Sequence, residues 1–172
     1  HACDAYILRC IHRRCNYDMA TVLTAQEAML EELELRMQGF TDQVEYIITD
    51  KLSYYIDQYE RSAMADVVIL QWIRSGYDTQ YLSTEHLKAL TTIVESMLQY
   101  QPFEVVTVHD EFRVHANNCN HLRQQYINIF AELAESNIFS DILSQIYGQD
   151  VVFTKLSNNL GELIRGSNYA LS

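Results

Sequence analysis

Hydrophobic residues spaced three or four positions apart predict a mostly helical chain. Ala2, Tyr6, Ile7, Cys10 and Ile11 follow this spacing and predict a helix over residues 2–17. The same pattern predicts further helices over 24–37, 41–61, 63–74, 83–100, 117–135 and 140–147. Thr24 and Glu27 fit a capping box for the second helix, and Gly39 would follow its end.

The pattern changes after Pro102, where residues that favour β-strands take over. Residues 105–108 and 112–114 are rich in valine and phenylalanine and predict an antiparallel hairpin joined through His109, Asp110 and Glu111. Residues 151–154 predict a further strand, followed by an apolar tail that we expect to be docked. The predicted fold class is therefore α+β, mostly helical, with one clear β-hairpin.

Composition supports a globular, helical protein. Hydrophobic residues make up 48% and charged residues 20%, which disfavours a disordered tail. No apolar run approaches the roughly 18 residues that cross a bilayer, so we expect no membrane contact. Glycine and proline together number six, too few for a typical all-β sandwich or barrel.

The first residues predict an intracellular piece of a longer protein. The four cysteines follow no secretory signal, which favours a reducing, intracellular setting. Because the chain starts at His1 with a helical pattern already in place, we expect it to begin inside a structured region.

Charge is unevenly distributed along the chain. The net charge of -11 argues against a nucleic-acid partner, since such domains usually carry a basic surface. Residues 24–104, however, hold fourteen acidic and five basic residues and so account for -9 of that charge. Residues 1–23 are slightly basic, which leaves the two ends of the chain free to approach a polyanion.

The predicted hairpin turn has unusual chemistry. Two-residue hairpin turns favour Asn-Gly or Asp-Gly because both central residues need positive φ, yet no glycine is present here. Acidic side chains at a rigid strand junction suit Mg²⁺, which prefers oxygen ligands and bridges to phosphates. An aspartate in a turn is also common for structural reasons alone, so both interpretations stay open at this point.

Three segments together resemble one enzyme family. VTVHDEFRVHA resembles motif C of the phage-type single-subunit RNA polymerases, found in phages and mitochondria, in which His-Asp lies between the two strands of the palm hairpin. HACDAYILR resembles the His-x-x-Asp helix that precedes motif C in that family, and SNYALS resembles its short aromatic C-terminal foot. VHDE alone also matches the family A DNA polymerases, but the first and last segments favour RNA polymerase.

The resemblance covers about residues 1–20 and 103–172 and implies three regions. Residues 1–23 would form the palm helix, 24–101 a helical insertion, and 102–172 the motif C hairpin with the following helices and foot. The first catalytic aspartate and the fingers helix of the family lie upstream of these motifs. The chain would thus be the C-terminal part, or one subunit, of a DNA-directed RNA polymerase, active only with the remaining portion. If it is viral, the resemblance places it in the infected host cytoplasm or the virion.

The resemblance also implies roles for individual residues. Asp110 would bind two Mg²⁺ ions together with the absent upstream carboxylate, and Glu111 would be a third, weaker ligand. His109 would orient the Asp110 carboxylate or contact the primer terminus. The resemblance implies a contact of His1 in the minor groove and a foot that includes Tyr169 and Ser172. Apart from the resemblance, Arg9, Arg13 and Arg14 could contact the nucleic-acid backbone, although arginine on an exposed helical face is the commoner case. The partners would be a DNA template, the RNA product and nucleoside triphosphates.

Other functions remain open. A family A-like DNA polymerase would use the same hairpin with deoxyribonucleotides. An acidic helical interaction protein would use the turn only structurally. A zinc site could use Cys10, Cys15, His12 and His1, but the Cys-x4-Cys spacing within a helix lacks a second pair, and core cysteines are the default expectation. We expect His86, His115 and His121 to be surface or hydrogen-bonded residues.

Overall fold

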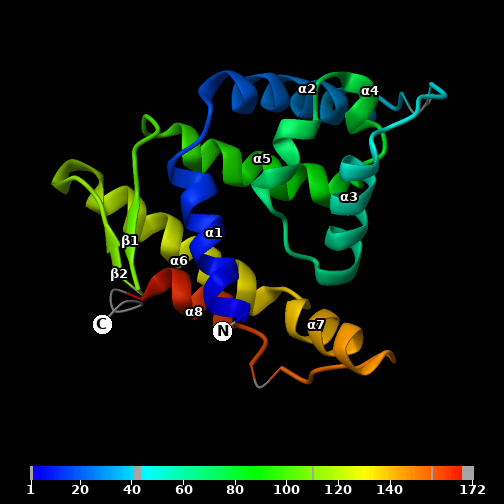
Figure 1. Cartoon of the computed structure of the whole chain (residues 1–172). Coiled ribbons are helices and arrows are strands. Elements are labelled where there is room, and N and C mark those ends of the chain that lie inside the picture. The colour runs from blue at the N-terminus through cyan, green and yellow to red at the C-terminus, as the bar shows by residue number, and fades with distance from the viewer. Residues whose placement is uncertain (1, 41–43, 110, 156, 168–172) are drawn as a thin grey trace.

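The computed structural model describes residues 2–40, 44–109, 111–155 and 157–167. The α-helices are α1 (Ala2–Cys15), α2 (Met19–Met37), α3 (Asp50–Ser62), α4 (Gly76–Thr79), α5 (Thr84–Leu98), α6 (Cys119–Glu135), α7 (Ile138–Tyr147) and α8 (Leu160–Gly166). Strands β1 (Val106–Val108) and β2 (Glu111–Arg113) form an antiparallel hairpin, the only sheet within the described ranges. The predicted mostly helical α+β fold is confirmed (Figure 1).

Two hydrophobic clusters organise these elements into an upper and a lower layer (Figure 1). The upper cluster draws its buried residues from the range 22–97, in α2, α3, α5 and the 3₁₀ helix Val67–Trp72. The lower cluster joins α1 to α6 and α7 and includes Val105 before the hairpin. Met64, inside the expected helical insertion, also belongs to the lower cluster, so the two layers share this part of the chain and the insertion stays a prediction.

Three predicted helix boundaries in the upper layer were wrong. Helix α2 begins at Met19, because the Asp18 side chain accepts a hydrogen bond from the Thr21 N–H at 2.8 Å, so the predicted capping box at Thr24 does not form its start. Helix α3 begins only at Asp50, after the cap Thr49. Residues 63–66 are not helical, and the 3₁₀ helix Val67–Trp72 replaces half of the predicted helix over 63–74.

The segment before α3 is not helical, because side chains from another part of the chain bind its backbone. The Gln80 amide bonds both the N–H and the C=O of Val44, at 3.0 and 2.8 Å. The Tyr81 hydroxyl bonds the N–H and C=O of Tyr46 in the same way. These long-range bonds outweigh the local helical spacing in this segment.

The second half of the chain agrees better with the prediction. Helix α5 begins after the cap Ser83, and α6 ends at Glu135 as predicted. The predicted strand over 151–154 is absent, because the N–H groups of Val151 and Phe153 bond to the hydroxyls of Ser144 and Ser140 on α7. Helix α8 was not predicted, and it packs along α6, where Gly161 lies directly against the Glu135 side chain.

None of the described helices is both long and apolar enough to cross a membrane.

Candidate functional site

The hairpin tip combines a short turn with an unusual backbone conformation. Val108 pairs with Glu111, so only His109 and Asp110 connect the strands and Glu111 belongs to β2, not to the turn as predicted. His109 has φ 57°, the left-handed region in which non-glycine residues are uncommon and cost about 1–3 kcal/mol. This conformation lets the turn close without a glycine. Asp110, the predicted metal ligand, lies outside the described residues.

The inner face of the hairpin is anchored to α6. Thr107 and Phe112 are paired across the strands and half-buried, while the flanking strand residues are exposed. The Phe112 ring meets Tyr126 of α6 edge-on, with ring centroids 6.0 Å apart, and Tyr126 in turn packs on Phe130. The hairpin is therefore held on a helix while its tip extends into solvent.

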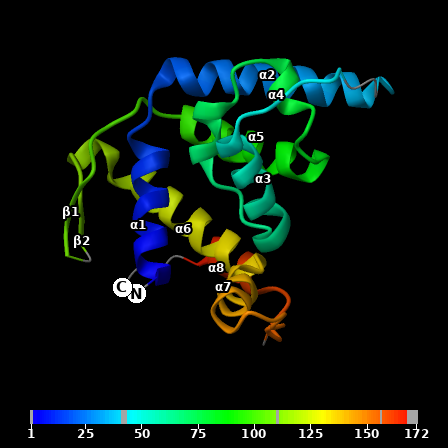
Figure 2. The ribbon, with the colours of Figure 1, turned by 45° about the vertical axis from the view of Figure 1, so that its right-hand side comes forward.

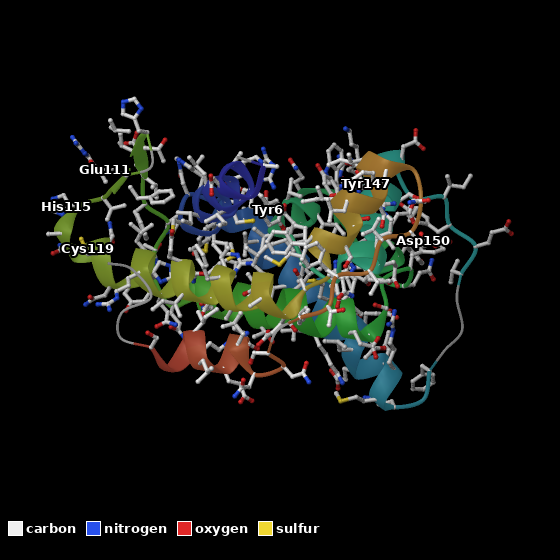
Figure 3. All side chains as sticks on the ribbon, turned by 90° about the horizontal axis from the view of Figure 1, so that it is seen from below. Tyr6, Glu111, His115, Cys119, Tyr147 and Asp150 are labelled. Atoms are coloured by element: carbon white, nitrogen blue, oxygen red, sulfur yellow. The ribbon has the colours of Figure 1, made fainter. Side chains whose placement is uncertain are left out.

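Glu111 lies on the outer, exposed face next to the turn, far from Tyr147 and Asp150 at the opposite end of the molecule (Figure 3). Its carboxylate accepts a hydrogen bond from Arg113 at 3.2 Å. Both side chains are about two-thirds exposed, so this ion pair contributes little stability. The Glu111 carboxylate can therefore exchange Arg113 for another cation.

Helix α1 reaches the same region through Asp4, the aspartate of the His-x-x-Asp segment. Burial raises the pKa of the Tyr126 hydroxyl, and the negative charge of Asp4 raises it further. Asp4 is thus close enough to act electrostatically on the tyrosine that supports Phe112. Two of the three family-like segments, far apart in sequence, are neighbours in the fold.

No three His, Cys, Asp or Glu side chains cluster into a metal site within the described part of the chain. Asp110 lies outside these residues, so the Mg²⁺ ligand pair of Asp110 and Glu111 stays a prediction. The donors expected there, two carboxylates on adjacent residues, have the oxygen chemistry that Mg²⁺ prefers.

The three arginines of α1 have different surroundings. Arg9 is exposed, as a contact to a nucleic-acid backbone requires. Arg13 donates a hydrogen bond to Asp66 at 2.5 Å and keeps a third of its side chain exposed. Arg14 is 1% exposed and pairs with Glu132, so the predicted nucleic-acid contact of Arg14 is wrong.

The sequence analysis did not predict the Arg14–Glu132 pair, although the helical spacing indicates that Arg14 is buried. Ile7, Cys10, Ile11 and Arg14 recur every three or four residues, which places Arg14 on the buried face of α1. An arginine on an apolar stripe calls for a buried acidic partner. The helical spacing alone could not show that Glu132 is that partner.

Cys10 and Cys15 belong to the lower hydrophobic cluster and are almost fully buried, as expected of core cysteines. Burial raises the pKa of each thiol to about 12, so both are protonated at neutral pH. A zinc ligand must be a thiolate, and no metal cluster is found within the described ranges. The zinc interpretation therefore has no support in the geometry.

Two of the three remaining histidines differ from the prediction. His86 and His121 are almost fully buried, whereas His115 is exposed. The His86 ring stacks on Tyr59 with centroids 3.9 Å apart, and burial lowers the pKa of His86 to about 4. His121 packs against Tyr100 and Phe103, and burial lowers its pKa as well. Both rings act as neutral aromatic core residues.

His1, Tyr169 and Ser172, predicted to contact nucleic acid or to form the foot, lie outside the described residues. Figures 1 and 2 show the described residues of α1 and of the hairpin. In both views the first turn of α1 and the hairpin tip lie at the same end of the molecule.

The chain matches no protein-family model and none of the curated proteins with which it was compared.

Proposed function

We propose that this chain is the C-terminal palm part, or one subunit, of a DNA-directed RNA polymerase of the phage type. The observation that carries the proposal is the hairpin tip. A two-residue His-Asp turn, with His109 in the left-handed conformation, projects from a short hairpin that Phe112 anchors to α6. Strained non-glycine residues cluster at functional sites, where the surrounding structure holds them in place.

The neighbourhood of α1 adds support. The charge of Asp4 contributes to the raised pKa of Tyr126, and the pair of buried Arg14 with partly exposed Glu132 ties α1 to α6. The segment that resembles the His-x-x-Asp helix and the segment that resembles motif C are thereby supported by one helix. A polymerase needs such a fixed arrangement, because the primer terminus must be positioned against the metal ligands.

In the proposed mechanism, Asp110 and an upstream carboxylate outside this chain would hold two Mg²⁺ ions. Such ions, when bound, activate the RNA 3′ hydroxyl and stabilise the charge that develops on the α-phosphate and the leaving pyrophosphate. His109 would fix the direction of the Asp110 carboxylate or donate a hydrogen bond at the primer terminus. Glu111 would add negative charge beside Asp110, and Arg9 would contact the nucleic-acid backbone.

The test is template-directed extension of an RNA primer with Mg²⁺. This chain is purified with the polypeptide that accompanies it in its natural source, because the proposal assigns the first catalytic aspartate and the fingers to residues outside these 172. The proposal expects incorporation of ribonucleotides opposite the template. Incorporation of deoxyribonucleotides alone would favour the family A-like DNA polymerase, and no incorporation by an intact complex would contradict both.

A further inference from the structure

A groove of about 780 Å³ lies on the upper layer, lined by α2, α3, α4 and the non-helical segments before α3 and after α4. We refer to it as the α2–α4 groove. Its apolar lining consists of Leu35, Phe40, Val44, Tyr77, Tyr81 and Leu82, and its acidic lining of Glu31, Glu32 and Glu60. Helices α2 and α4, which line the groove, lie in the upper layer, away from the hairpin tip (Figure 1).

The apolar side of the groove is unusually open to solvent. Phe40 is 61% exposed, Val44 56% and Tyr77 52%. Scattered exposed apolar residues are ordinary, but these converge on one concave surface. Contiguous apolar surface of this kind, bordered by polar residues, is typical of protein-binding sites.

The wall of the groove is already in place. The Gln80 amide bonds both backbone groups of Val44, and the Tyr81 hydroxyl bonds both backbone groups of Tyr46. The Tyr46 ring also stacks on Tyr77, with centroids 5.5 Å apart. A partner would therefore meet a formed surface and would lose less free energy in ordering it.

The charge of the groove selects the partner. Arg36 is the one cationic residue among the described lining, and it is engaged by Glu32 at 2.8 Å and by the Thr84 hydroxyl. Glu31 and Glu60 have no ion-pair partner among the described residues. The surrounding residues 24–104 carry a formal charge of -9. Apolar surface beside unneutralised carboxylates complements a segment that combines apolar side chains with lysine or arginine.

We propose that the α2–α4 groove docks a basic amphipathic segment of a partner protein. The apolar side chains of that segment would cover Phe40, Val44 and Tyr77, and its cations would neutralise Glu31 and Glu60. This inference does not depend on the polymerase proposal, because the groove shares no residue with the hairpin tip. Primer extension and groove binding can therefore fail separately.

The test uses a fluorescent synthetic amphipathic peptide of leucine and lysine, with a leucine–glutamate peptide of the same pattern as comparison. Binding to the 172-residue chain is followed by fluorescence anisotropy. The wild type is expected to bind the lysine peptide and not the glutamate peptide. The double variant Glu31→Lys/Glu60→Lys should weaken binding about tenfold or more, because two attractive charges become repulsive.

A matched control distinguishes binding at the groove from a general effect of net charge. Glu95→Lys/Asp150→Lys makes the same change in net charge at exposed positions outside the groove lining. The proposal expects binding within about twofold of the wild type for this control. Equal weakening by both double variants would overturn it, since binding would then follow net charge alone.

The apolar contribution is tested with Tyr77→Ser, whose fold is checked by circular dichroism. Weaker peptide binding at both low and high salt is expected, because apolar contact is not screened. Unchanged binding would overturn the proposal. So would a wild-type dimer in sedimentation experiments that Tyr77→Ser dissociates, because the groove would then be occupied by a second copy of this chain.

Discussion

The Arg14 guanidinium donates two hydrogen bonds to the Glu132 carboxylate, at 2.9 and 2.5 Å, and thereby ties α1 to α6. Arg14 is 1% exposed, and its burial disfavours the charged form. The hydrogen bonds and the charge of Glu132 outweigh that burial, so the pKa of Arg14 is raised. The pair thus keeps the buried charge of Arg14 stable on α1 through Glu132, which lies on α6, the helix that supports the hairpin.

Removing the acidic partner should be strongly destabilising. We expect Glu132→Leu to lower the free energy of unfolding by about 3–5 kcal/mol, because the buried guanidinium loses its counter-charge. The double variant Arg14→Met/Glu132→Leu should recover much of this loss, since it leaves no unpaired charge. Urea unfolding of the wild type, both single variants and the double variant measures the coupling. Additive losses in this cycle would contradict a direct stabilising pair.

Stability should depend on pH through His86. The pKa of His86 is lowered to about 4 in the folded chain, whereas an unfolded histidine titrates near its ordinary value of about 6.5. Between these values the unfolded chain binds a proton that the folded chain does not. The contribution of His86 to the free energy of unfolding is therefore fully present above about pH 6.5. It is lost as the pH falls towards 4, by up to about 3 kcal/mol.

The variant His86→Phe isolates this contribution. Phenylalanine keeps an aromatic ring against Tyr59 but cannot titrate. Urea unfolding at pH 7.0 and 4.5, compared between wild type and variant, should show a smaller loss of stability for the variant. The same loss in both proteins would show that His86 does not contribute, since the carboxylates titrate alike in the two.

The backbone of His109 gives a separate prediction. Asparagine adopts the left-handed region readily, whereas β-branched residues are strained there. We expect His109→Asn to leave the free energy of unfolding nearly unchanged, and His109→Val to lower it by roughly 1–2 kcal/mol. Thermal unfolding of both variants is the measurement. Equal stability of the two would mean that the turn does not hold φ 57° at this position.

Local signals in the sequence were sufficient where neighbouring residues decide the structure. Ser83 caps α5 and the valines of β1 mark the hairpin, and both elements formed close to the predicted positions. The non-helical segment at Val44 could not be predicted, because its backbone bonds to Gln80, which is distant in the sequence. The predicted strand over 151–154 failed for a similar reason, since serine hydroxyls of α7 bind its N–H groups.

In the candidate site, too, only the features set by neighbouring residues could be predicted from the sequence. The hairpin was predicted from its strand-forming residues and the turn from His109, Asp110 and Glu111, of which Glu111 belongs to β2. The missing glycine marked the turn as costly, and the left-handed conformation of His109 agrees with that. The support of the hairpin by Tyr126 and the proximity of Asp4 depend on how α1 and α6 pack. Helical spacing gives the buried face of each helix but not which helices meet, so these relationships needed the fold.

The most direct test of the central claim compares Asp110→Asn with wild type in RNA primer extension with Mg²⁺, using the purified complex. Asp150→Asn, an exposed position far from the hairpin, is the matched control (Figure 3). We predict that Asp110→Asn assembles normally and loses activity by several orders of magnitude, because a metal ligand that stabilises transition-state charge is removed. Asp150→Asn should retain full activity. Full activity of Asp110→Asn would contradict the polymerase assignment and leave the His-Asp turn with a structural role alone.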